Sequence, residues 1–245
     1  MFWLNINVNQ LNFFSQSMTF IIAIQLNDSI IVTADNKEVV IKKGKNTTHQ
    51  ENSISKMHSW EKGIITGTGE SNLIHITVAL FKEFDGLEVN ELPKYLEISR
   101  HIREIELGTE HFQVQTTKLI CSSFIEHGAQ LYKLESMDGK QSYSMVLVEP
   151  MDITVWMFNP NIEAISEDLQ NLYADLKDYA SFMNQTDWMN YYINRIAPIY
   201  QKQSKIDPMM SQSFDLFFQT KDQYFYGHIP NTQNKTLEFK EISTK

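Results

Sequence analysis

Cysteine, glycine and positive charge are all scarce in this chain of 245 residues. The single cysteine, Cys121, excludes an intrachain disulfide and a cysteine-based zinc cluster, and it predicts a reducing, cytoplasmic location. The low count of 9 glycines argues against a glycine-rich loop that binds phosphate. The 21 Lys and Arg face 30 Asp and Glu, and the formal charge of −9 argues against a nucleic-acid or anionic-membrane partner.

Long apolar runs and metal-binding spacings are also missing. No stretch reaches the roughly 18 consecutive apolar residues of a membrane span, and residues 1–18 lack the basic start of a secretory signal. His49, His58 and His75 lie near one another in sequence, but without HExxH or similar spacing they predict neither a metal nor another cofactor. The composition is globular, with 42% hydrophobic and 12% aromatic residues, which excludes a mainly disordered chain.

Hydrophobic patterning predicts alternating blocks of strands and helices. The apolar runs at 19–26 and 30–34 flank a polar turn and predict a β-hairpin that is buried on both faces. Residues 42–52 are polar and predict a loop. Three- and four-residue apolar spacing predicts helices at 71–84, 90–106, 162–182 and 187–204. The other predicted strands are 39–41, 62–66, 118–125, 130–135, 142–148, 213–220, 223–229 and 236–242.

The order of these elements indicates the fold class. Strands, two helices, strands, two helices and strands follow one another, without an internal repeat or a Pro/Gly-rich linker. Hairpins in place of regular β-α-β alternation favour antiparallel sheets with helices outside and a sheet-on-sheet core in one domain.

Four segments carry a resemblance to a known family. The first is TFIIAI at 19–24 with IIVTAD at 30–35, in which Asp35 follows Thr19 by sixteen residues. The others are SKMH at 55–58 with IITGTG at 64–69, LICSSFIEHGAQLYKL at 119–134, and IDPMMSQSFD at 206–215. In order and spacing they resemble proteasome β-type subunits, in particular the bacterial proteasome-like peptidases. The resemblance implies an α+β fold for residues 19–245, the four-layer αββα sandwich of the N-terminal-nucleophile hydrolases.

The resemblance also implies a site and a reaction. Thr19 is the implied nucleophile, and its own α-amine is the base, because a free hydroxyl is a weak nucleophile. Asp35 and Lys56 form the implied charge pair beside the hydroxyl. The backbone N–H of Gly69 stabilises the oxyanion, although Gly67 is an alternative for that role. Asp207 and Ser211 are implied to order the α-amine, and the substrate is a peptide or protein amide bond.

This chemistry requires Thr19 to become the first residue. Residues 1–18 are therefore interpreted as an extension, either a propeptide or a misassigned start. Met18 stands directly before Thr19, and its removal after initiation at that methionine exposes the amine. A propeptide in the family usually ends in Gly, which Met18 does not match. If residues 1–18 are retained, the α-nitrogen of Thr19 is part of an amide and the site is inactive.

The implied partners leave alternatives open. Family members assemble into rings, and some depend on an ATPase unfoldase, so self-association and such an ATPase are expectations here. The chain departs from the family where residues 159–166 replace a small Gly/Ser-rich segment. A catalytically inactive structural or binding subunit is therefore the first alternative, and a small-amide hydrolase on the same fold is the second.

Overall fold

The hairpin at the centre of the molecule is formed by β2 (Ile21–Gln25) and β3 (Ile30–Asp35). The structure is a computed structural model that describes residues 13–17, 19–42, 48–83, 88–137, 142–157 and 161–232. The two strands pair antiparallel, with Ile21 opposite Ala34, and every residue in them is buried. The predicted hairpin, buried on both faces, is confirmed.

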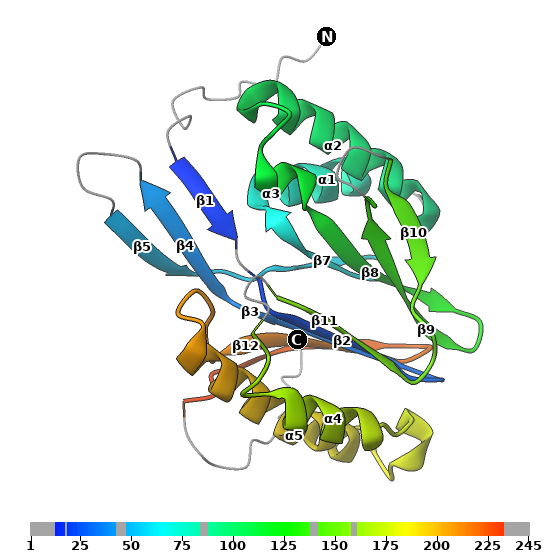
Figure 1. Ribbon diagram of the computed structural model, residues 1–245. Coiled ribbons are helices and arrows are strands. Elements are labelled where there is room, and N and C mark those ends of the chain that lie inside the picture. Colours follow the sequence, from blue (N-terminus) through cyan, green and yellow to red (C-terminus); the bar gives the residue numbers. More distant parts are fainter. Residues whose placement is uncertain are drawn as a thin grey trace, which may run out of the picture.

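This hairpin belongs to one of two antiparallel sheets, which are stacked on each other (Figure 1). The five-stranded sheet has the order β11-β2-β3-β12-β13, with β11 at Asp152–Trp156, β12 at Phe214–Gln219 and β13 at Tyr224–Ile229. The eight-stranded sheet has the order β10-β9-β8-β7-β1-β4-β5, with β6 paired to β7. Its strands are β1 (Phe13–Ser17), β4 (Lys37–Lys42), β5 (Thr48–Ser53), β6 (Met57–Trp60), β7 (Gly63–Glu70), β8 (Lys118–Ile125), β9 (Gly128–Glu135) and β10 (Ser144–Leu147).

Helices cover the outer face of each sheet (Figure 1). α1 (Ser71–Glu83), α2 (Leu92–Leu107) and the short α3 (Phe112–Gln115) lie over the eight-stranded sheet. α4 (Ser166–Ala174) and α5 (Gln185–Ile206) lie over the five-stranded sheet, and the 3-10 turns are η2 (Val89–Glu91) and η3 (Tyr179–Ser181). The predicted α+β sandwich of two antiparallel sheets flanked by helices is confirmed.

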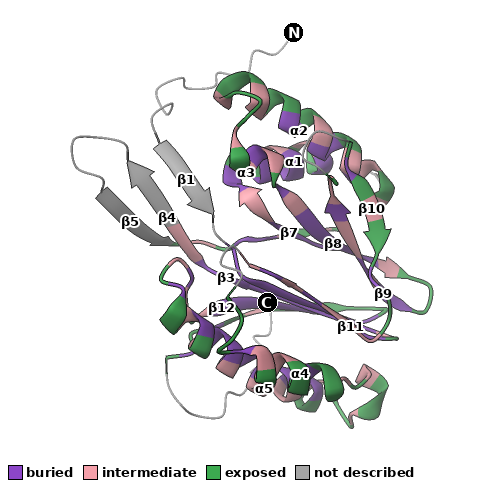
Figure 2. Ribbon diagram, viewed as in Figure 1, coloured by how far each residue is buried: buried purple, intermediate pink, exposed green. Residues whose placement is uncertain are grey.

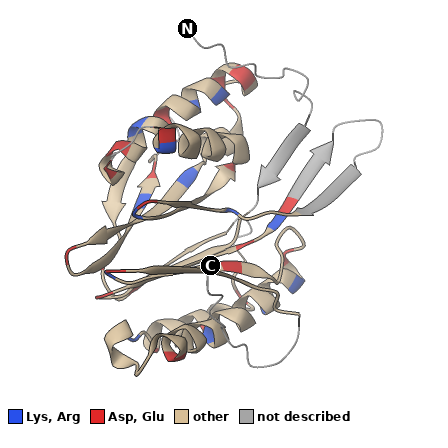
Figure 3. Cartoon of the chain, turned by 180° about the vertical axis from the view of Figure 1, so that it is seen from behind, with Lys and Arg blue, Asp and Glu red and all other residues tan. Residues whose placement is uncertain are grey.

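Three apolar layers hold the four layers of secondary structure together, as the buried strands in Figure 2 show. Alternate residues of β2 point to opposite sides of the sheet, because side chains alternate along a strand. Ile22 and Ile24 pack with α5, whereas Ile21 and Ala23 pack with the eight-stranded sheet. A third layer lies between that sheet and α1 and α2. Charged residues of both signs are mixed over the outer helices (Figure 3).

The structure corrects several predicted element boundaries. β5 begins within residues 42–52, which were predicted as a loop, and its sequence THQENS has no apolar pattern that marks a strand. β11 and the strand β1 within residues 1–18 were also not predicted. β7 continues through the glycines at 67 and 69, where the predicted strand ended. The predicted strand at 236–242 lies outside the described residues.

The predicted helix at 162–182 ends early, at Ala174, for a reason that the contacts explain. The segment after it is tied to the turn between β2 and β3. Asp178 accepts hydrogen bonds from the backbone and side chain of Asn27, both at 2.9 Å. Asp28 accepts from the backbone of Tyr179 at 3.0 Å and of Ala180 at 2.9 Å. These bonds replace the helical ones. In the described part of the chain, no helix is both long enough and apolar enough to cross a membrane.

Candidate active site at the end of the central hairpin

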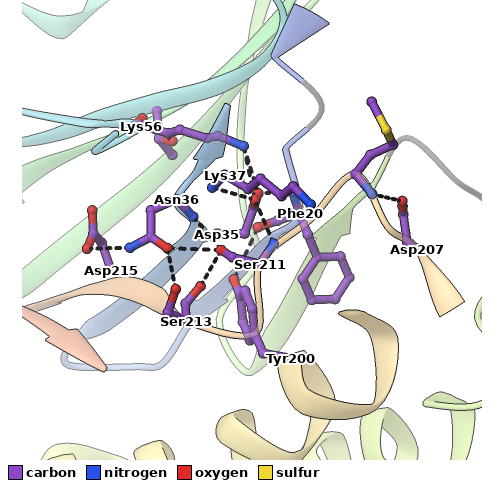
Figure 4. Close-up of polar contacts among 12 residues, drawn as sticks. Phe20, Asp35, Asn36, Lys37, Lys56, Tyr200, Asp207, Ser211, Ser213 and Asp215 are labelled. Atoms are coloured by element: carbon purple, nitrogen blue, oxygen red, sulfur yellow. Dashed lines mark hydrogen bonds and ion pairs between the residues drawn. The ribbon is translucent and has the colours of Figure 1, made fainter. Parts of the chain in front are cut away.

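Asp35, the last residue of β3, is the centre of a cluster of hydrogen bonds. It is fully buried, and its Oδ1 accepts from the backbone N–H of Phe20 at 2.8 Å. Its Oδ2 accepts from the backbone N–H of Lys37 at 3.1 Å and of Ser211 at 3.4 Å. The carboxylate thus joins the residue after Thr19 to two other segments (Figure 4).

The strongest partner of Asp35 is the ammonium of Lys56. Lys56 Nζ lies 2.9 Å from Oδ1 and 3.1 Å from Oδ2, and the lysine side chain is only 4% exposed. Burial lowers the pKa of Lys56, and the charge of Asp35 opposes that shift. Asp35 thus contacts both Lys56 and the backbone of Phe20, the residue after Thr19. The catalytic roles that the resemblance implies for Thr19, Asp35 and Lys56 stay predictions.

Thr19 is 1% exposed in the full chain. The backbone of the next residue, Phe20, is fixed on both sides, since its N–H donates to Asp35 and its carbonyl accepts from the backbone N–H of Asp35 at 3.1 Å. The buried Tyr200 hydroxyl also lies 3.1 Å from that carbonyl. The Phe20 and Tyr200 rings meet edge to face with centroids 4.9 Å apart. Thr19 therefore begins a rigid segment.

Ser211 belongs to the same cluster. In addition to its N–H bond to Asp35, its Oγ accepts from the backbone N–H of Asn36 at 3.0 Å and lies 2.9 Å from Asn36 Oδ1. Ser213 Oγ donates to the same Asn36 oxygen at 2.7 Å. Ser211 therefore connects the segment after α5 to the end of β3.

Asp207 lies apart from the cluster around Asp35 (Figure 4). It follows the last residue of α5, and its Oδ1 accepts from the backbone N–H of Met209 at 2.9 Å. The shift of the Lys56 pKa comes mainly from burial and from Asp35, and Asp207 has the smallest influence on it. Asp207 thus stabilises its own turn, and its predicted role in ordering the α-amine stays a prediction.

Gly69 is the second-last residue of β7, and α1 begins two residues later. Its φ of +123° is one that other residues rarely adopt, and a Cβ there would collide with the side chain and the Cα of Thr117. Gly69 is also opposite Ser17 of β1 in the sheet. The residue that is predicted to stabilise the oxyanion thus faces the segment that precedes Thr19. Gly67, the alternative, lies in mid-strand opposite Leu119 of β8.

We expect alanine at Gly69 to destabilise the protein more than alanine at Gly108. Gly108 also has a positive φ, of +95°, but nothing lies within 4 Å of the added Cβ. Gly108→Ala should therefore cost only about 1–2 kcal/mol of unfolding free energy from backbone strain. Gly69→Ala adds a collision and should cost more than about 3 kcal/mol. Urea denaturation measures both, and equal losses would contradict the collision with Thr117.

Sequence reasoning missed the residues that complete the cluster. Asn36 Nδ2 lies 3.3 Å from Asp215 Oδ1 and 3.0 Å from His228 Nδ1. The Tyr226 hydroxyl donates to Asp215 Oδ2 at 2.9 Å and lies 2.5 Å from that of Ser55, next to Lys56. These polar residues carry no spacing signal, because β12 and β13 reach β3 only through the tertiary fold.

Comparisons with known proteins identify structures that share this fold. No family model matches the chain, and no curated protein is similar to it in sequence. Among solved structures, it is similar to Anbu (ancestral beta-subunit) from Yersinia bercovieri, with a TM-score of 0.55 and 10% identity over 84% of this chain and 86% of that one. An Anbu mutant from Hyphomicrobium sp. strain MC1 has a TM-score of 0.58 and 11% identity over 88% and 89%. The chain therefore shares the fold of these structures.

These findings correct the family that the sequence suggested. The four segments pointed to proteasome β-type subunits and bacterial proteasome-like peptidases, but the similar structures are ancestral beta-subunits, and no family model supports the narrower assignment. At 10–11% identity the likeness is one of fold alone. The error has a physical source, because the segments that carry the resemblance include the buried hairpin and the strands packed against it. Any chain with this fold needs buried apolar strands at these places, so the segments indicate the fold and do not distinguish one family from another.

Proposed function

We propose that this protein is a threonine-type N-terminal-nucleophile hydrolase that cleaves peptide amide bonds once residues 1–18 have been removed. The observation that carries the proposal is the buried pair of Lys56 and Asp35, whose Oδ1 also accepts the N–H of the residue after Thr19. A buried ammonium beside a hydroxyl favours its deprotonated form, and a free α-amine has a pKa of about 8, which suits a base at neutral pH.

The reaction follows from these groups. The Thr19 oxygen adds to the amide carbonyl while its proton passes to the α-amine, and the oxyanion accepts a hydrogen bond from the Gly69 N–H. The carbon–nitrogen bond then breaks, the leaving amine takes the proton, and an ester on Thr19 remains. Water adds to that ester, releases the acid and restores the hydroxyl. Asp35 keeps the ammonium of Lys56 in place throughout.

The position of β1 supports a peptide as substrate over a small amide. β1 pairs antiparallel with β4 on one side and with β7 on the other, so it fills a slot between two strands. A peptide that adds as a strand in this slot gains main-chain hydrogen bonds from both neighbours. Ser17 opposite Gly69 is two residues before Thr19. We infer that β1 occupies the substrate slot of the intact chain and that residues 19–245 form the working domain.

The burial of Thr19 favours a second candidate, a subunit without catalytic activity. Thr19 is 1% exposed, and while residues 1–18 remain attached its nitrogen is part of an amide. A chain that keeps this extension would serve only as a structural or binding subunit. The similar structures are named as subunits, which suits a protein that assembles with copies of itself. We therefore propose self-association into a ring for either candidate. A cytoplasmic location and an ATPase partner stay predictions.

Processing of the N-terminus distinguishes the two candidates. We expect a chain that begins at Thr19, released from a cleavable leader, to hydrolyse fluorogenic peptides. A chain that keeps residues 1–18, confirmed by intact mass, should be inactive because its α-nitrogen cannot accept a proton. If the natively expressed protein retains the extension and both forms are inactive, the subunit without catalytic activity is the correct candidate.

A further inference from the structure

A narrow pocket lies next to Lys56. It lies between the segment that leads into β6, the strand β7 and the first turns of α1. Its polar lining is unusual for an acidic protein, since it holds one lysine, two histidines and two serines but no carboxylate. Its lining residues are Ile54, Ser55, Lys56, His58, Gly67, Ser71, Ile74 and His75.

The two histidines form a pair. The rings of His58 and His75 meet edge to face with centroids 5.2 Å apart, and His75 Nδ1 lies 3.4 Å from Ser71 Oγ. Burial lowers the pKa of His58 to about 4, with further contributions from His75 and Lys82. Every charged group that acts on His58 is thus positive or able to become positive. Among the described residues, no third side chain completes a metal site with this pair.

The pocket is placed to receive a substrate side chain. Lys56 lines it and is bound to Asp35, which in turn holds the segment that begins with Thr19. Gly67 also lines it, and Gly67 is on the same face of β7 as Gly69, because side chains two apart along a strand share a face. A peptide in the slot with its carbonyl at Thr19 and Gly69 therefore has its adjoining side chain beside this pocket.

We propose that His58 and His75 select an acidic side chain, Asp or Glu, at the substrate residue that contributes the scissile carbonyl. This inference rests on the proposed function and names its substrate class. A carboxylate in the pocket accepts hydrogen bonds from the imidazoles and from Ser71, and it supplies the negative charge that the lining lacks. Ile54 and Ile74 line the rest of the narrow space.

A peptide series tests this selectivity. The chain that begins at Thr19 is assayed with fluorogenic peptides that carry Glu or Gln at the residue contributing the scissile carbonyl. We expect kcat/KM at pH 6 to be about tenfold higher for the Glu peptides than for the matching Gln peptides. His75→Gln should abolish the difference, and because His75 is exposed, the variant should fold like the unmutated chain. His101→Gln, on the exposed side of α2, is the matched control and should keep it. Equal rates for Glu and Gln, or a preference that survives His75→Gln, would overturn the inference.

A binding experiment separates this inference from the proposed function. In the chain that begins at residue 19 and carries Thr19→Ala, N-acetyl peptide amides ending in Glu, Gln or Leu are titrated while the histidine ring resonances are followed by NMR. The Glu peptide should bind about tenfold more tightly and raise the pKa of His58, because a carboxylate beside an imidazole favours the protonated form of the ring. Selective binding without hydrolysis by the unmutated chain would refute only the hydrolase. Hydrolysis without selectivity, or no binding of the Glu peptide, would refute only the acidic pocket.

Discussion

Alanine in place of Thr19, in the chain that begins at this residue, is expected to lower kcat/KM for peptide hydrolysis by at least about 10³-fold. The hydroxyl is the atom that forms the ester, so no neighbouring group can replace it. Thr19→Ser keeps a hydroxyl in the same place and should retain activity to within about tenfold. Steady-state rates with a fluorogenic peptide measure both variants.

The control for this variant is another buried threonine. Thr77 in α1 is fully buried, and its hydroxyl donates to the carbonyl of Leu73 at 2.8 Å, in the outer helical layer. Thr77→Ala should therefore lower stability slightly and leave the rate of hydrolysis unchanged. Hydrolysis that persists in Thr19→Ala would show that the nucleophile is a different residue.

The second large effect is expected at the pair of Asp35 and Lys56. Asp35→Asn leaves the Lys56 ammonium buried without its counter-ion, which should cost about 3–5 kcal/mol of unfolding free energy. Asp35→Asn combined with Lys56→Met removes both charges, so the double variant should be more stable than Asp35→Asn alone. Both should lose hydrolysis by at least about 10²-fold, since neither presents a compensated ammonium to Thr19.

This pair of variants separates stability from catalysis. If the double variant recovers stability and stays inactive, the ion pair acts in the reaction and not only in the fold. Lys94→Met, which removes an exposed lysine 3.6 Å from Glu91, should change stability by less than about 1 kcal/mol. Denaturation by urea and peptide hydrolysis measure the set. Full activity in Lys56→Met would contradict the proposed role of the ammonium.

The sequence predicted most of the architecture because hydrophobic periodicity depends on local geometry. The hairpin of β2 and β3 and the helices α1, α2 and α5 all follow from apolar spacing within a single element. The errors occur where partners distant in sequence decide the structure. β5 is polar and is a strand through its pairing with β4, and α4 ends early because Asp28 and Asp178 join the following segment to the β2–β3 turn.

The candidate site divides in the same way. The sequence by itself determined that Thr19 and Asp35 flank a buried hairpin, because apolar runs and turns are local patterns. It pointed to these two residues and Lys56 as one site only through the resemblance, and their roles stay predictions. Only the tertiary structure decided that Ser211 joins them and that Asp207 turns to its own loop. It also decided that β1 fills the slot before Gly69, and that His58 and His75 meet beside Lys56. These contacts join separate segments, and packing between sheets and helices creates them without any local pattern in the chain.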